Sequence, residues 1–148
     1  MDRILVGLDA SPNADGVLDT ATELARRTGG KLILFRAVGI PNEIPIEAYT
    51  MTPASLADLL QREAEKYLDA IAAKLPAGLM AEKVVTVGTP WRSICAAADA
   101  HNADLIIIGS HGYSGIDKLI GTTAGKVVNH AKQSVLVVRG HPSFAPAS

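Results

Sequence analysis

Cysteine is almost absent from this sequence, because only Cys95 occurs among its 148 residues. A single cysteine cannot form an intramolecular disulfide, so the packed core alone must hold the fold together. A domain of this length buries about 68–70% of its unfolded surface and needs no covalent cross-link. A lone thiol and a self-sufficient core predict a reducing, cytoplasmic environment.

An excess of charge of one sign is also missing. The chain has 14 Lys and Arg against 15 Asp and Glu, for a formal net charge of −1. Proteins that bind nucleic acid or anionic lipid through charge carry a basic excess, so we expect neither partner. No apolar stretch approaches the roughly 18 residues of a membrane span, and the opening MDRILVGLDASP does not predict a secretory signal.

What the sequence does contain is a set of short apolar runs, mostly continuous rather than alternating. Continuous runs of β-branched residues are typical of strands buried on both faces of a parallel sheet. The runs are Ile4–Leu8, Leu32–Val38, Val84–Val87, Leu105–Ile108 and Val135–Val138. The length fits one domain, which we place at residues 1–140, with a flexible tail at 141–148.

Helical patterns separate these runs, and three of them share a start signal. A hydroxyl residue precedes proline at Ser11-Pro12, Thr52-Pro53 and Thr89-Pro90, where the hydroxyl can cap free amides. Gly29-Gly30 is a stop signal for the first helix, whereas the fourth helix is entered through glycines. The alternation predicts an α/β fold, a doubly wound five-stranded parallel sheet with helices on both faces.

Ligands of such sheets lie beyond the carboxyl ends of the strands, where the strand order reverses. We expect the first and fourth strands to flank that point, and they end near Asp9 and Gly109. Asp9 therefore suits a hydrogen bond to a ribose or a base edge. The alternative is an aspartate that only shapes the turn before Ser11.

A glycine-rich segment, GSHGYSGIDKLIGTT, follows the fourth strand from Gly109 to Thr123. Glycine lets backbone amides approach a ligand closely, and a helix N-terminus binds anions. The segment therefore predicts a phosphate cradle. It is neither a Walker loop, because Val127 follows Gly125-Lys126, nor a dinucleotide fingerprint, because the first strand leads into GLDASPNAD.

At this point the sequence resembles the universal stress protein family. The resemblance rests on ILVGLDASPNA, VGTP, ADLIIIGSHG and GTTAGKVVNHAKQSVLVVR, and it covers nearly the whole chain. It implies strand order 3-2-1-4-5 and a bound adenine nucleotide, ATP or a relative. The metal that we expect with such a nucleotide is Mg²⁺, held by phosphate and water. The residues that the resemblance assigns to the nucleotide are Asp9, Ala37 and Ile108 near the adenine, and Gly109, His111, Gly112, Gly121, Thr122 and Thr123 near the ribose and phosphates.

One departure from the family pattern keeps a second function open. The ATP-binding branch has nine residues between G-x-x-G and G-(S/T), whereas eight residues separate Gly112 from Gly121 here. The first hypothesis is an ATP-binding stress-response regulator that acts on an unidentified protein partner. The second is a nucleotide-independent interaction module, with the resemblance implying a homodimer through the edge strand 134–139.

A hydrolase or transferase is the third and weakest hypothesis. In the sequence no G-x-S-x-G elbow or histidine–carboxylate pair supports catalysis, so we assign no catalytic residue and expect slow hydrolysis or none. No two histidines have metal-ligand spacing with a carboxylate or thiolate, so we expect no protein-built zinc site. Cys95 lies on an apolar helix stripe and is interpreted as a core residue.

Overall fold

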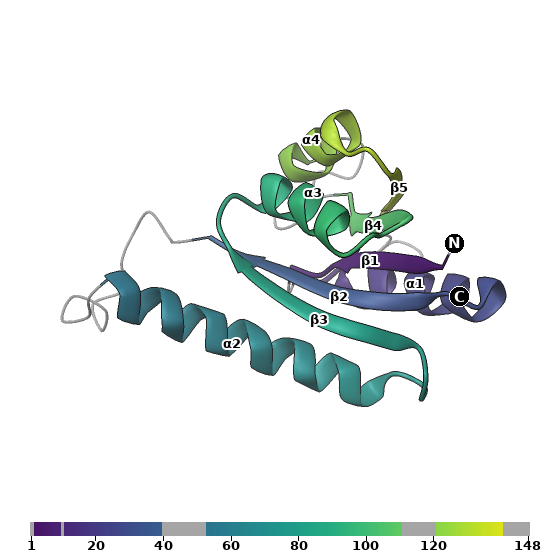
Figure 1. The fold of residues 1–148 in the computed structure, drawn as a ribbon, viewed down its shortest axis with the longest axis horizontal. Coiled ribbons are helices and arrows are strands. Elements are labelled where there is room, and N and C mark those ends of the chain that lie inside the picture. Colours follow the sequence, from purple (N-terminus) through teal and green to yellow (C-terminus); the bar gives the residue numbers. More distant parts are fainter. Residues whose placement is uncertain (1, 10, 40–52, 111–120, 141–148) are drawn as a thin grey trace.

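The structure, a computed structural model, describes residues 2–9, 11–39, 53–110 and 121–140. Strands and helices alternate along the chain as the sequence predicts (Figure 1). The elements are β1 (Arg3–Gly7), α1 (Ala14–Thr28), β2 (Lys31–Val38), α2 (Pro53–Lys74), β3 (Met80–Val87), α3 (Pro90–Ala100), β4 (Leu105–Gly109), α4 (Thr122–His130) and β5 (Ser134–Val138).

All five strands form one parallel sheet in the order β3-β2-β1-β4-β5. This confirms the predicted α/β class and strand order. The central strands are the continuous apolar runs, since Leu5, Ile33 and Ile106 are fully buried. Their side chains have no polar surface to face, because helices cover the sheet on both sides.

Two separate cores pack against the sheet, one on each face. On one face α1 and α2 cover residues such as Ile4, Leu32 and Ile107. On the other face α3 and α4 cover their strand neighbours, such as Leu5 and Ile106. Figure 1 shows α2 below the sheet and α3 with α4 above it. The side chains alternate between the two cores because successive strand residues point to opposite faces.

Six strand bounds differ from the predicted apolar runs, and only the start of β3 differs by more than one residue. β3 begins at Met80, four residues before the predicted Val84, and β1 ends at Gly7 rather than Leu8. β3 is an edge strand, and Ala81 and Lys83 in its first half are exposed. Polar residues are tolerated there because an edge strand has a neighbouring strand on one side only, and its faces are only partly covered. Hydrophobic runs therefore underestimate the length of edge strands.

The helix ends follow glycine more closely than they follow hydroxyl residues. Gly29 ends α1 in the left-handed conformation with φ of 74°, as predicted. Ser11 does not cap α1, because the helix begins at Ala14 with Asn13 as its N-cap. Instead the Ser11 hydroxyl accepts a hydrogen bond from the Asn13 amide at 3.3 Å, inside the turn that precedes the helix. Thr52 lies outside the described residues.

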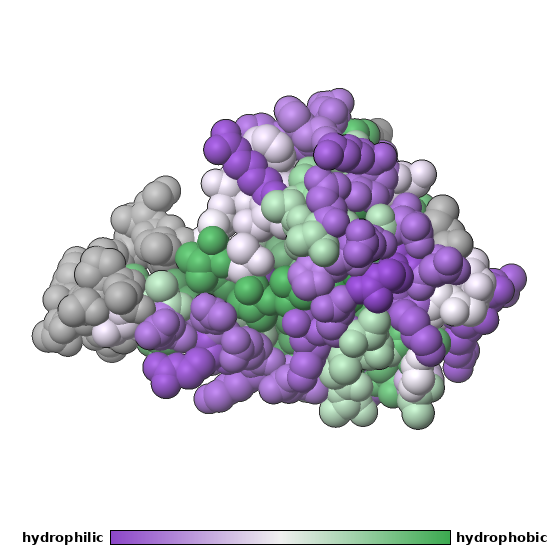
Figure 2. All heavy atoms as spheres, in the orientation of Figure 1, coloured by the Kyte–Doolittle hydropathy of each residue, from purple (hydrophilic) through white to green (hydrophobic). Residues whose placement is uncertain are grey.

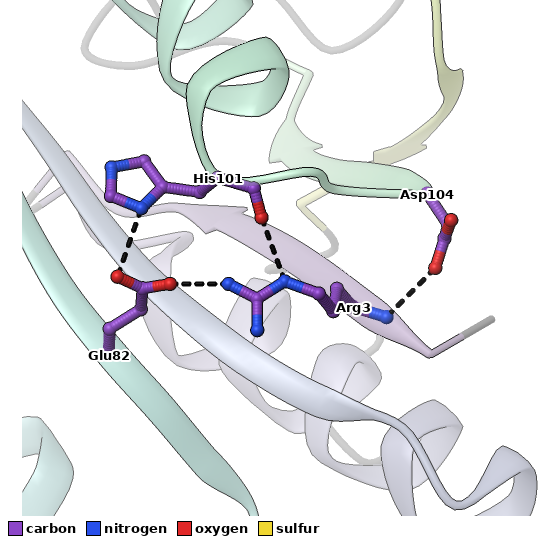
Figure 3. A network of polar contacts seen from close by, with 4 residues as sticks. All are labelled: Arg3, Glu82, His101 and Asp104. Carbon is purple, nitrogen blue, oxygen red and sulfur yellow. Dashed lines mark hydrogen bonds and ion pairs between the residues drawn. The ribbon is translucent and has the colours of Figure 1, made fainter.

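A network of polar contacts joins the amino ends of the strands, at the end of the sheet opposite Gly7 and Gly109 (Figure 3). The Arg3 guanidinium pairs with Glu82 and donates from Nε to the His101 carbonyl at 2.7 Å. The His101 Nδ1 lies 2.9 Å from the second Glu82 oxygen. The network joins β1, β3 and the end of α3, which are far apart in sequence.

Asp104 is the fourth member of this network, and its charge should make stability depend on pH. Its Oδ2 accepts hydrogen bonds from the amides of Arg3 and Asp2, at 3.0 and 2.9 Å, which lower the pKa of the carboxyl below its usual value. A carboxyl with a lowered pKa stabilises the fold above its unfolded pKa, and this contribution is lost as pH falls through the folded pKa.

We therefore expect Asp104→Asn to lower the melting temperature at pH 7. The deficit should begin to shrink only below about pH 4, the ordinary pKa of an aspartate, and should disappear below the lowered pKa of the folded state. Thermal melts by circular dichroism between pH 7 and pH 3 measure this difference. A deficit of the same size at every pH would mean that shape, rather than charge, is what Asp104 contributes.

Candidate functional site

A cavity of about 470 Å³ lies at the carboxyl ends of β1, β2 and β4, where the first turns of α3 and α4 meet the sheet. Figure 2 shows apolar surface over the carboxyl-terminal parts of β2 and β3, between α2 and α3. The cavity is lined by Gly7, Leu8, Asp9, Phe35, Ala37, Pro90, Ile94, Ile108, Gly109, Gly121, Thr122, Thr123 and Ala124. This is the position at which the strand order reverses.

Most residues predicted for a ligand line this one cavity. They are Asp9, Ala37, Ile108, Gly109, Gly121, Thr122 and Thr123. Four separate segments contribute them, so the fold brings together residues that the sequence spreads over more than a hundred positions. His111 and Gly112 lie outside the described residues, and their assignment stays a prediction.

Sequence reasoning missed the apolar wall of the cavity. Phe35 and Ile94 line it, together with Leu8 and Pro90. Phe35 stands two residues before Ala37 on β2, so the two side chains share a face of the sheet. The alternation of side chains along a strand could have placed Phe35 beside Ala37, but the nearly continuous apolar run of β2 obscures that alternation.

Gly7 forms part of the cavity floor because a larger residue would not fit there. A Cβ atom at Gly7 would lie 2.9 Å from the Cγ2 of Ile108 and 3.7 Å from the Cδ1 of Ile94. Real Cβ atoms do not approach other carbon atoms this closely, so β1 can lie beside these side chains only with glycine at its end. The close packing of Ile108 against β1 therefore requires a small residue at position 7, and the sequence pattern did not predict this.

The polar side of the cavity is the start of α4. Gly121 is the N-cap and offers no side chain to the helix amides, and the first turn holds no acidic residue. The Gly121 amide donates to the Ser110 carbonyl at 2.6 Å, and the Ser110 amide donates to the Val138 carbonyl at 2.8 Å. The start of α4 is thereby fixed to the ends of β4 and β5. Its first amides and its dipole favour an anion beside Thr122 and Thr123.

Asp9 is the only carboxylate among the described residues that line the cavity. Its Oδ1 accepts a hydrogen bond from the Ser11 amide at 3.0 Å, which is the turn geometry typical of aspartate. Asp9 therefore shapes the turn before Ser11, which was the alternative role that the sequence left open. The same residue also borders the cavity, so the turn fixes the position of its carboxylate there.

Reactive and metal-binding groups do not gather at the described part of the cavity. Cys95 lies outside the lining, and burial together with the nearby Asp99 raises the pKa of its thiol above the usual value. A raised pKa disfavours the thiolate that nucleophilic chemistry requires. In the described ranges no three His, Cys, Asp or Glu side chains are grouped as metal ligands. The helices described there are also too short or too polar to cross a membrane.

Comparison with known sequences decides the family. The sequence model of the universal stress protein family matches residues 1–139. This chain belongs to the universal stress protein family. Universal stress protein A homolog 2 of Coxiella burnetii, strain RSA 493, is 35% identical over 138 residues. The match covers 93% of this chain and 94% of that protein.

Solved universal stress protein structures share the fold. The universal stress protein UspA from Lactobacillus plantarum aligns with a TM-score of 0.73 at 27% identity, over 93% of this chain and 97% of that one. Another universal stress protein, crystallised in complex with cAMP, aligns with a TM-score of 0.60 at 28% identity and with the same coverage of both chains. The motif resemblance is therefore confirmed across the whole fold.

The close approach at Gly7 makes a testable prediction for this universal stress protein. Gly7→Ala should lower the free energy of unfolding by about 1–3 kcal/mol, because the added methyl must displace Ile108. Gly16→Ala is the matched control, since a Cβ there meets nothing within 4 Å. Gly16 lies in the first turn of α1, so Gly16→Ala should be neutral or should stabilise the fold by up to about 1 kcal/mol.

Urea unfolding of the two variants and the parent protein gives these free energies. Equal effects of the two substitutions would show that the end of β1 relaxes more easily than its contacts suggest.

Proposed function

We propose that the cavity binds an adenine nucleotide, ATP among its ligands, and that the chain acts as a nucleotide-dependent regulator in the stress response. The observation that carries this proposal is the pairing of an apolar wall with the start of α4 in one cavity. A nucleotide has the same two-part chemistry, a flat base with apolar faces and an anionic phosphate end.

The two parts of the cavity suit the two parts of such a ligand. Phe35, Ala37 and Ile108 give the base a surface from which water is excluded. Gly121 and Thr122 offer backbone amides and a hydroxyl to phosphate oxygens at the positive end of the α4 dipole. The similar universal stress protein crystallised with cAMP supports an adenine nucleotide as the ligand class.

A magnesium ion is proposed only as a companion of the nucleotide. Mg²⁺ prefers six oxygen ligands and keeps several water molecules. Among the described lining residues Asp9 alone offers a carboxylate, and it already accepts the Ser11 amide. The residues present fit a cation held mainly by phosphate oxygens and water, with Asp9 as the protein oxygen within the cavity.

We propose little or no hydrolysis of the bound nucleotide. Attack by water requires a general base within hydrogen-bond reach of it. Among the described residues that line the cavity there is no histidine, and the only carboxylate is the turn aspartate. Nucleotide binding would then act by favouring one conformation of the site and one surface for a protein partner. The lone, partly buried Cys95 suits a cytosolic location for this role.

A second proposal, a homodimer through β5, follows from the open edge of the sheet. Among the described strands β5 pairs only with β4, so none of them covers its outer edge. Leu136 on this strand is 38% exposed, and apolar edge strands need a cover. Antiparallel addition of β5 from a second copy would supply it. If nucleotide did not bind, this surface would be the functional part.

Blocking the apolar wall tests nucleotide binding. Ala37→Leu should weaken ATP binding at least about tenfold, because the longer side chain occupies the space proposed for the base. Ala100→Leu is the matched control, since Ala100 is exposed at the far end of α3 and should bind as the parent does.

Isothermal titration calorimetry measures both variants, and mass spectrometry of denatured, freshly purified protein identifies any nucleotide that copurifies. The absence of heat with millimolar ATP and AMP, with no nucleotide released, would refute the proposal.

Sedimentation velocity tests the dimer. The parent protein should sediment as a dimer at micromolar concentration, and Leu136→Lys should shift it to monomer by placing a charge at the apolar edge. A monomeric parent protein would exclude edge pairing at that concentration.

A further inference from the structure

A cluster of cationic and aromatic side chains, which we call the α3–α4 rim, lies where the first turn of α3 meets α4. Trp91 is at its centre. The Arg92 guanidinium carbon lies 5.2 Å from the centroid of the indole, and the Lys126 Nζ lies 5.6 Å from it. The His130 ring stacks against the same indole with a centroid distance of 4.6 Å. These distances are within the range of cation–π attraction.

The α3–α4 rim begins directly beside the cavity. Trp91 and Arg92 follow Pro90, which lines the cavity at the start of α3. Lys126 stands four residues after Thr122, another lining residue, so both lie on the same side of α4. The long side chains of Arg92 and Lys126 are therefore rooted within one helical turn of the cavity, next to its polar end.

Among the described residues, no carboxylate pairs with either cation of the α3–α4 rim, unlike several other cations of the chain. Within the described ranges neither Arg92 nor Lys126 forms an ion pair. By contrast, Lys132 lies 3.6 Å from Asp99, and Arg27 lies 2.7 Å from Glu23. The indole holds the two charges in place without neutralising them. Within the described part of the chain, the rim is thus a region of positive charge with no carboxylate paired to it, beside a site that suits phosphate.

We propose that Arg92 and Lys126 form a subsite for the outer phosphate groups of the bound nucleotide, an inference that rests on the function proposed above. The cavity and the start of α4 accommodate the nucleoside and the first phosphate. Each further phosphate adds negative charge that extends toward the α3–α4 rim. The chain therefore binds nucleoside di- and triphosphates more tightly than the monophosphate, and these two side chains are the reason.

Trp91 reports on this subsite directly, because it is the only tryptophan of the chain. When phosphate draws Lys126 away from the indole, the fluorescence of Trp91 changes. ATP and ADP should change its emission at saturation, whereas AMP should bind with a much smaller change. Calorimetry on the same samples, in EDTA so that the phosphates keep their full charge, gives the three affinities. Added salt should reduce the preference for ATP over AMP.

A charge-removing variant tests the residues themselves. Lys126→Met keeps the length of the side chain and should lower the ratio of ATP to AMP affinity by about threefold to tenfold, with AMP affinity unchanged. Lys132→Met is the matched control. It removes a cation just after the end of the same helix, and this cation pairs with Asp99. It should leave the ratio unchanged. Circular dichroism melts verify that both variants fold.

The outcomes separate the two proposals. ATP binding with the same ATP-to-AMP ratio in the parent and in Lys126→Met overturns the subsite and leaves the nucleotide function standing. A parent protein that binds AMP and ATP equally, with no difference in Trp91 emission, overturns it without any variant. A parent protein that binds no nucleotide at millimolar concentration overturns both the subsite and the proposed function.

Discussion

The pairing of β1 with β4 is the constraint on which the rest of the molecule depends. Residues 4–6 of β1 lie beside residues 105–107 of β4, although about a hundred positions separate them in the chain. The order of the strands reverses across this pair, so the helices that follow β1 and β4 leave on opposite faces of the sheet. A crevice at the carboxyl ends of the two strands is a geometric result of that divergence.

The amino and carboxyl ends of the strands consequently differ in the polar groups that they carry. At the amino ends charged side chains are paired, as in the contacts between Arg3, Glu82 and His101. At the carboxyl ends polar groups belong largely to the backbone, and the cations Arg92 and Lys126 are held by an indole. The paired charges at the amino ends are satisfied within the fold, whereas no carboxylate among the described residues pairs with Arg92 or Lys126. This division explains how the site can hold positive character without loosening the sheet that positions it.

The sequence predicted the parts of the fold that burial dictates. The inner strands and the position of the cavity could be predicted, because continuous apolar runs and glycines mark them locally. The early start of β3 at Met80 could not, because an exposed edge strand needs no apolar run. The pairing of Arg3 with Glu82 gives no local signal either, since 79 positions separate the two residues. The requirement for Gly7 arises from Ile108, a contact that exists only after the sheet has formed. His111 and Gly112 stay predictions.

The hydrogen bond between Ser110 and Gly121 has a consequence for how the chain can vary. It fixes the two ends of the intervening ten residues to the sheet and to α4, whatever their number. The entropy of closing such a segment changes only by about 0.1 kcal/mol when one residue is added or removed. Length here is therefore nearly neutral for folding, and the one-residue difference from the family pattern leaves the frame of the crevice intact. Insertions and deletions between these two residues therefore leave unchanged the scaffold that an engineer or natural selection builds on.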